Sequence, residues 1–403
     1  MTLAEMKQLY DENIMGTYGR AEVAFVRGRG CTLVDSEGNE WLDCLAGIAV
    51  CGLGHSHPAV VQAVADQAER LMHTSNLYYI PTQAEAAAEL TSTCELDKVF
   101  FGNSGAEAIE ASIKLARKWG KQSKSGAYKI VAAEASFHGR TLCSLTATGQ
   151  PKYQEAFKPL VPGFVHVPFG DIGAMEQAID DETVAVLLEP IQGESGVRIP
   201  PDGYLAEVRA LCDRHSLVMI LDEIQTGLGR TGKWFAHQHE DIVPDVMAVS
   251  KALGAGFPIG ACMARGEFAD VLVPGDHAST FGGNHLGCAA VTAFLRTMKS
   301  DRVVENAQVM GNYAVERLTD LAAERPGAVK EIRAKGLMIA MELTDGVARQ
   351  VLASLHGRRV LANAIGDHIL RILPPLIIGP TEIERFVEAL SQSLDEAGAT
   401  GAP

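Results

Sequence analysis

The sequence lacks any apolar run long enough to cross a membrane, and it lacks any cluster of basic residues. Its longer apolar stretches, such as residues 44–53 and 217–221, fall short of the roughly 18 residues that a membrane helix requires. Acidic residues number 50 and basic ones 35, which gives a formal charge of -15. Without a basic stripe to follow a phosphate backbone, nucleic acid is not predicted as a partner, and neither is a membrane. An anionic substrate would have to be held by a few local arginines.

Paired cysteines are also missing. The chain has eight cysteines, but no CxxC motif and no dense framework of the kind found in small secreted proteins. The first residues, MTLAEMKQLYDEN, contain acids and no apolar stretch of the kind found in an export signal. We therefore expect a cytoplasmic protein with reduced thiols.

What the sequence does have is length and a regular alternation of elements. At 403 residues it exceeds the roughly 250 to 300 residues at which a single core stops growing, so we expect two packed domains. Short apolar runs that end in a polar residue alternate with helical patterns, as in βαβ units. The runs cover residues 98–101, 129–133, 184–188, 217–221 and 246–249. Uninterrupted Val, Ile and Leu predict an α/β fold with a mostly parallel central sheet, buried on both faces.

The composition of the chain predicts where the domains divide. Residues 55–295 contain the apolar runs and are predicted to form a large domain. Residues 296–403 contain two amphipathic helices and short strands, and are predicted to form a smaller α+β domain. Residues 1–54, with glycines spaced for a hairpin, are expected to join that smaller domain. The tail from Glu396 has the composition of a disordered end.

A glycine-rich turn at residues 102–105 follows the first of these runs and precedes a helical pattern. Free N–H groups and the positive end of the helix dipole suit such a turn to binding a phosphate. The same residues are also consistent with an ordinary turn in which Ser104 caps the helix. The turn alone does not decide between these interpretations.

Asp222 ends another apolar run. A carboxylate buried there needs a partner, because burial without one would raise its pKa or cost stability. The protonated ring nitrogen of a cofactor would satisfy this need. A metal ion, a helix cap or a salt bridge would satisfy it equally well.

Lys251 emerges from the run at 246–249 into a glycine-rich turn. Most lysines lie on the surface, and this is the simplest interpretation of the residue taken alone. A lysine at the end of a buried strand is, however, placed to lose solvent, which lowers its pKa and favours the neutral amine. Schiff-base chemistry with an aldehyde requires that neutral form.

An anion cradle, a buried acid and a buried lysine on neighbouring strand ends together suggest a pyridoxal phosphate site. Four strings, LDEIQTGLGRTG (221–232), SKALGAGFPIGA (250–261), SFHGRT (136–141) and STFGGN (279–284), resemble those of the class III aminotransferases. The similarity runs from about Tyr18 to the last predicted helix. Within the class, the strings GNSGAEAIEASIKLAR, LTATGQPKY and EPIQGESGV are most similar to the acetylornithine branch.

The resemblance implies a fold type I transferase that binds pyridoxal 5'-phosphate. Lys251 would form the Schiff base with the cofactor and, once displaced by the substrate, would move a proton. Asp222 would hold the ring nitrogen and keep the ring an effective electron sink.

Other cofactor contacts follow from the same resemblance. Gln225 would lie near the 3'-oxygen, and Phe137 would stack on the ring. The backbone of Gly105 and Ala106 would bind the phosphate, and Thr280 would reach it from the partner subunit of a homodimer with shared active sites.

The resemblance also implies a set of substrate-binding residues. Arg140 would bind the α-carboxylate of N-acetylornithine, and Arg371 would clamp the α-carboxylate of 2-oxoglutarate. Glu194 would pair with Arg371 while the amino donor is bound and release it for the keto acid. Ser279 belongs to the same predicted set. Tyr18 would line the donor pocket, although it also fits as a core aromatic.

These expectations amount to an N-acetylornithine:2-oxoglutarate aminotransferase of arginine biosynthesis that transfers the δ-amino group. Ornithine, succinylornithine and 4-aminobutyrate are alternative donors within the family, and an aminomutase is a further alternative. No metal is expected, because the H-x-H pairs at 55–57 and 237–239 lack further ligands at fixed spacing. The glycines of TGLGRTG do not match the dinucleotide-binding fingerprint.

Overall fold

The computed structural model describes residues 1–344 and 346–398, so residues 399–403 of the predicted tail lie outside the described residues, whereas Glu396, where that tail was predicted to begin, still belongs to the last helix. It contains three β-sheets, with seven strands in the largest and four in each of the others. The strands are β1 (Phe25–Arg29), β2 (Thr32–Asp35), β3 (Glu40–Asp43), β4 (Lys98–Gly102), β5 (Lys129–Ala133), β6 (Phe164–Val167), β7 (Thr183–Leu188), β8 (Val218–Asp222), β9 (Val246–Val249), β10 (Gly260–Ala264), β11 (Val329–Lys335), β12 (Met338–Leu343), β13 (Val360–Leu361), β14 (Asn363–Ile365) and β15 (Ile369–Ile372).

Helices connect and cover these strands. The α-helices are α1 (Leu3–Asn13), α2 (Ala46–Ala49), α3 (Pro58–Arg70), α4 (Pro81–Thr91), α5 (Gly105–Ser123), α6 (Leu142–Ala147), α7 (Pro151–Gln154), α8 (Ile172–Ala178), α9 (Tyr204–His215), α10 (His285–Ser300), α11 (Val303–Ala323), α12 (Ala348–Gly357) and α13 (Pro380–Glu396). Short 3-10 turns are η1 (Glu155–Phe157), η2 (Ala236–His239), η3 (Lys251–Gly254) and η4 (Gly266–Asp270).

The seven-stranded sheet has the order β4-β10-β9-β8-β7-β5-β6 and confirms the prediction of a mostly parallel α/β sheet. Every residue of β7 and β8 is buried, because α5 packs on one face of the sheet while α8 and α9 pack on the other. β10 runs antiparallel to both of its neighbours. The sequence analysis missed β10, whose run GACMA consists mainly of small residues.

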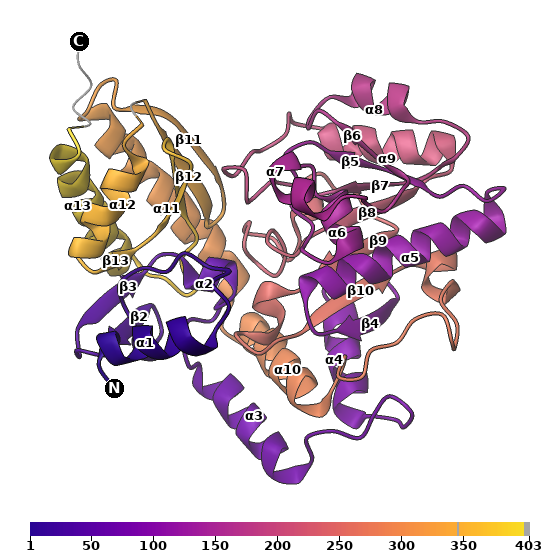
Figure 1. Cartoon of the computed structure of the whole chain (residues 1–403), viewed down its shortest axis with the longest axis horizontal. Helices are drawn as coiled ribbons and strands as arrows, with labels where there is room; N and C mark the ends of the chain where they lie inside the picture. The colour runs from indigo at the N-terminus through magenta and orange to yellow at the C-terminus, as the bar shows by residue number, and fades with distance from the viewer. Residues whose placement is uncertain (345, 399–403) are drawn as a thin grey trace.

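The two smaller sheets lie on the left of Figure 1, beside the large sheet. One has the order β1-β2-β3-β13, in which β3 near the N-terminus pairs in parallel with β13 near the C-terminus. The other has the order β11-β12-β15-β14 and carries Arg371 on β15. The hairpin expected from the glycine spacing in residues 1–54 is the β2–β3 pair. Gly38 lies at its turn with a φ of 87°, a conformation that favours glycine.

Parallel strands bring their carboxyl ends to one edge of a sheet, and ligands gather there in open α/β sheets. At this edge β8 ends in Asp222, β9 leads into Lys251, β7 leads into Glu189 and β4 leads into the N-terminus of α5. The fold thus collects the polar side chains that followed the apolar runs in the sequence. Among the described residues, no helix is both long and apolar enough to span a bilayer.

Candidate active site

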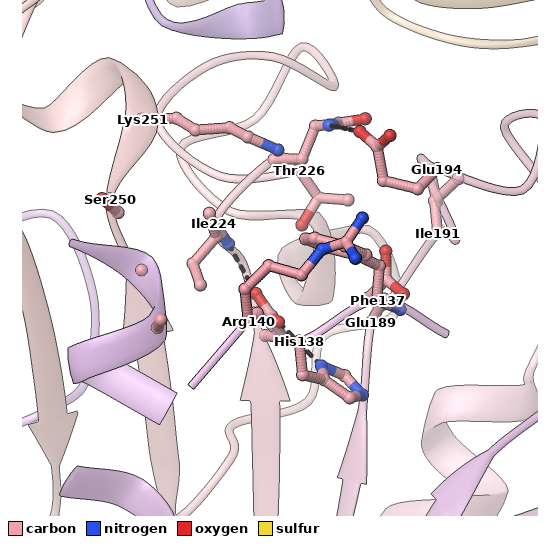
Figure 2. Close-up of a pocket in the computed structure, with 15 residues that line it drawn as sticks. Phe137, His138, Arg140, Glu189, Ile191, Glu194, Ile224, Thr226, Ser250 and Lys251 are labelled. Carbon is pink, nitrogen blue, oxygen red and sulfur yellow. Dashed lines mark hydrogen bonds and ion pairs between the residues drawn. The ribbon is translucent and has the colours of Figure 1, made fainter. Parts of the chain in front are cut away.

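A cavity of about 290 Å³ lies at the carboxyl edge of the large sheet (Figure 2). In this view Lys251 reaches in from one side and Glu194 from the other, above the strand ends. The lining residues come from the loops after β4, β5, β7, β8 and β9, and they include most of the predicted site. They are Gly105, Ala106, Phe137, His138, Gly139, Arg140, Glu189, Ile191, Glu194, Asp222, Ile224, Gln225, Thr226, Ser250 and Lys251.

Lys251 is the first residue of η3, directly after β9 and Ser250. Its φ of 39° is in the left-handed region, where holding a non-glycine residue costs about 1 to 3 kcal/mol. Burial lowers the pKa of the Lys251 ammonium, and the negative charge of Glu194 offsets only part of this effect. The strained backbone and the lowered pKa are both properties of a lysine that serves as a nucleophile or base rather than as a surface charge.

Asp222 is 3% exposed and makes two polar contacts. Its Oδ2 lies 2.8 Å from Nδ1 of His138, and its Oδ1 accepts a hydrogen bond from the backbone N–H of Ile224 at 3.1 Å. The ion pair and the turn cap that the sequence left open as alternatives are therefore both present. Sequence reasoning missed His138, although it stands inside the SFHGRT string. Its Nε2 is buried and has no hydrogen-bond partner among the described residues.

The N-terminus of α5 forms another wall of the cavity. Ser104 caps the helix, and its Oγ accepts a hydrogen bond from the N–H of Glu107. Gly105 and Ala106 follow the cap, in the first turn, where backbone N–H groups have no partner within the helix. A Cβ on Gly105 would come within 2.8 Å of Ile224, so close packing requires glycine here. Capping by Ser104 therefore leaves the backbone N–H groups of Gly105 and Ala106 without a partner within the helix.

Arg140 lies at the rim of the cavity, against two aromatic rings. Its guanidinium carbon is 3.8 Å from the ring centroid of Tyr153 and 5.4 Å from that of Phe137. Such cation–π contacts restrict a long exposed side chain. Sequence reasoning missed Tyr153, whose only signal was its place in the LTATGQPKY string.

Arg371 is 2% exposed and lies behind Glu194, which lines the cavity. Its Nη1 donates to Oε1 of Glu194 at 2.8 Å and to the carbonyl of Gly193 at 3.0 Å, while Nη2 donates to Asn363. Gln225 donates from Nε2 to the same Glu194 oxygen. Burial alone would raise the pKa of Glu194, but the charges of Arg371 and Lys251 and these hydrogen bonds lower it overall. The predicted pairing of Glu194 with Arg371 exists in the structure.

Besides Arg371, which reaches the cavity only through Glu194, three residues of the predicted site lie outside the cavity of their own chain. Tyr18 is 75% exposed, which makes its interpretation as a core aromatic wrong. Thr280 is exposed, and Ser279 is half-buried, with its Oγ accepting hydrogen bonds from Asn103 and from the N–H of Gly282. The structure therefore does not bring these three residues into the cavity within a single chain.

The histidines of the H-x-H pairs are engaged elsewhere. Nε2 of His55 lies 2.6 Å from Oδ2 of Asp43, and this contact raises the pKa of His55 to about 9. Nδ1 of His237 lies 3.1 Å from Oε1 of Glu223. One ring of each pair thus contacts a carboxylate, and among the described residues no group of three or more His, Cys, Asp or Glu side chains is arranged to hold a metal ion.

Comparisons with known proteins agree with this geometry. The family model "Aminotransferase class-III" matches residues 16–394. An acetylornithine aminotransferase of Methanopyrus kandleri is 48% identical over 397 residues, which cover 98% of this chain and 100% of that protein.

Solved structures extend the likeness to three dimensions. An ornithine aminotransferase of Toxoplasma gondii has a TM-score of 0.95 at 33% identity, covering 99% of this chain and 96% of that one. An acetylornithine aminotransferase of Elizabethkingia anophelis has a TM-score of 0.87 at 33% identity, covering 98% of this chain and 100% of that one. Both likenesses span nearly the whole chain, including all the elements that form the cavity.

Proposed function

The chain belongs to the class III aminotransferases, which are enzymes that depend on pyridoxal phosphate, and on that premise we propose that it transfers the δ-amino group of N-acetylornithine to 2-oxoglutarate. The observation that carries the proposal is one cavity that a lysine of lowered pKa shares with Arg140 at the rim and with Glu194, which is paired with Arg371. This reaction would serve arginine biosynthesis.

The residues around the cavity fit pyridoxal phosphate. The first turn of α5, at Gly105 and Ala106, offers N–H groups and the positive dipole end to a phosphate, with no side chain at Gly105 to obstruct it. Asp222 and Gln225 both line the cavity, and the buried carboxylate of Asp222 would face a protonated ring nitrogen. Phe137 supplies an apolar wall.

When bound, the cofactor supplies an electron sink for negative charge that develops on the substrate carbon. Asp222, held by His138, would keep a proton on the ring nitrogen through its buried carboxylate. Lys251 would take a proton from the donor's δ-carbon at Nζ and pass it to the cofactor, and would carry a proton in the opposite direction for the keto acid, because its lowered pKa favours the neutral amine. Because Asp222 is 3% exposed, solvent screens its charge only weakly.

Two arginines would let one cavity serve two anionic substrates. Arg140, held on Tyr153, would bind the α-carboxylate of the donor. While the donor is bound, Glu194 would neutralise Arg371, and the δ-amine would approach Lys251 without meeting an unpaired guanidinium. When 2-oxoglutarate replaces the donor, its α-carboxylate would take the place of Glu194 on Arg371.

We further propose a homodimer in which Thr280 completes the phosphate site of the partner subunit. Large apolar side chains are exposed beside Thr280, including Leu77, Tyr78, Tyr79 and Phe281. They form one surface, because Asn76 donates hydrogen bonds to the carbonyls of residues 279 and 282. An exposed apolar surface of this kind is typical of a protein interface.

We also propose that the chain divides into two domains and that the protein is located in the cytoplasm. A small domain built from residues 1–54 and 296–403 around a large domain of 55–295 is supported by the pairing of β3 with β13. A cytoplasmic location is supported by the cysteines, all eight of which are free thiols.

Half-reactions with individual donors test the substrate assignment. We expect N-acetylornithine to react with the cofactor-loaded enzyme with a kcat/KM at least about tenfold above that of ornithine, succinylornithine or 4-aminobutyrate, a difference of ~1.4 kcal/mol. The physical reason is that ornithine carries an α-ammonium, which would lie near Arg140, whereas the acetyl group removes that charge. Stopped-flow absorbance of the bound cofactor gives each rate. Equal or faster reaction with 4-aminobutyrate would refute the assignment.

A further inference from the structure

Glu189 is a buried carboxylate that binds two loops of the cavity at once. It follows β7 directly and is 6% exposed. Its Oε1 accepts a hydrogen bond from the backbone N–H of Phe137 at 2.8 Å, and its Oε2 accepts one from the N–H of Gly193 at 3.2 Å. Phe137 lies in the loop after β5, and Gly193 lies in the loop after β7. One side chain therefore fixes the spacing between the aromatic wall and the loop that precedes Glu194.

The position of Gly193 is tightly constrained on its other sides. Its carbonyl accepts a hydrogen bond from Nη1 of Arg371 at 3.0 Å, the same nitrogen that donates to Glu194. A Cβ on Gly193 would lie 1.9 Å from Oε1 of Gln225, so the backbone already packs directly on that side chain. A shift of the Gly193 N–H away from Glu189 would therefore displace the carbonyl that orients Arg371.

The charge on Glu189 controls both hydrogen bonds. Burial raises the pKa of Glu189 to about 7, the nearby Asp222 adds to this effect, and His138 with the two N–H donors opposes it. Lys251 also interacts electrostatically with this carboxylate. When ionised, each oxygen of Glu189 accepts from one N–H group. When protonated, one oxygen carries a hydrogen that opposes its N–H partner, so one of the two bonds is lost.

We propose that Glu189 is a positioning residue that joins the Phe137 wall of the cavity to the Gly193 and Arg371 clamp for the keto acid. It touches neither substrate nor reacting atoms in this role and acts through the backbone of its two donors. The inference rests on the proposed function for the identity of the clamped substrate. The two hydrogen bonds themselves do not depend on that identity.

Glu189→Gln tests the proposal, because an amide has one acceptor oxygen and must turn its NH2 group toward one of the two N–H donors. A hydrogen bond to a charged group contributes enough for about a tenfold effect. We expect amide hydrogen exchange, followed by mass spectrometry of the full-length protein with and without cofactor, to become about tenfold faster at Phe137, Gly193 or both. In kinetics, the KM for 2-oxoglutarate should rise about tenfold. We also expect kcat/KM of the unmodified enzyme to decline below about pH 7 as Glu189 is protonated, and this decline to be absent from Glu189→Gln.

Glu240→Gln is the matched control. Glu240 accepts a single backbone N–H, that of Ala206 at 3.0 Å, through Oε2, and it does not line the cavity, so an amide can replace it without loss. The proposal would be overturned if exchange at both Phe137 and Gly193 were as slow in Glu189→Gln as in the unmodified enzyme. It would also be overturned if kcat/KM of the variant still declined below about pH 7. Faster exchange in an enzyme that does not accept 2-oxoglutarate would support the positioning role and count against the substrate assignment alone.

Discussion

Replacing Lys251 by alanine is expected to lower the transamination rate by at least about four orders of magnitude. Its amine is the lysine nitrogen that lines the cavity, and burial lowers its pKa so that the neutral form is available. Alanine retains no group that can bind the cofactor aldehyde or move a proton. The rate is measured as steady-state formation of glutamate from 2-oxoglutarate. The visible absorbance of the purified Lys251→Ala variant, which reports bound cofactor, should be lost on dialysis.

Lys233→Ala is a suitable control, because Lys233 is an exposed lysine that does not line the cavity. Its rate and its absorbance should equal those of the unmodified protein. Thermal unfolding of both variants without cofactor would separate a loss of chemistry from a loss of fold. A Lys251→Ala enzyme that retains more than about a hundredth of the original rate would contradict the assigned role.

Asp222→Asn is expected to lower kcat/KM for both substrates by about 100- to 1000-fold, the range seen when one electrostatic contact to the reacting group is removed. Asparagine has nearly the same shape and can still accept from the N–H of Ile224, but it carries no negative charge to face His138 or a protonated ring nitrogen. Because the charge acts in both half-reactions, the two substrates should be affected alike. Single-turnover absorbance measurements of each half-reaction provide the comparison.

Asp171→Asn controls for the same chemical change at a site outside the cavity. Asp171 caps α8 by accepting a hydrogen bond from the N–H of Ala174, and asparagine is an equally good cap. This variant should retain full activity. If Asp222→Asn stays within threefold of the unmodified enzyme, then Asp222 does not hold the ring nitrogen.

The part of the fold that the sequence predicted is the part with strong burial. Residues 184–188 of β7 and 218–221 of β8 are all apolar because helices cover both faces of the sheet, and such runs identify strands without tertiary information. β10 and β13 were not predicted. Small residues fill β10, and β13 has two residues and is defined by its pairing with β3, more than 300 residues earlier in the chain. Pairing of this kind leaves no periodic signal in a local window.

A similar limit applies to the candidate site. Lys251 and Asp222 stood out because each is a charged residue at the end of an apolar run. His138 and Glu189 act through contacts that span 84 and 52 residues of sequence, to Asp222 and to the backbone of Phe137. Glu189 follows β7 just as Asp222 ends β8, so an acid at a strand end was an available signal. Its two partners are the backbone N–H groups of Phe137 and Gly193, which the sequence cannot identify because they depend on how the loops are placed.

The most direct test of the whole account is to follow the transferred nitrogen atom. N-acetylornithine labelled with nitrogen-15 at the δ-position is mixed with 2-oxoglutarate and the cofactor-loaded enzyme, and the products are measured by NMR. The account predicts labelled glutamate in an amount equal to the donor consumed, and none from Lys251→Ala. Turnover of the donor that leaves the label in the same carbon skeleton, or that proceeds without 2-oxoglutarate, would contradict it.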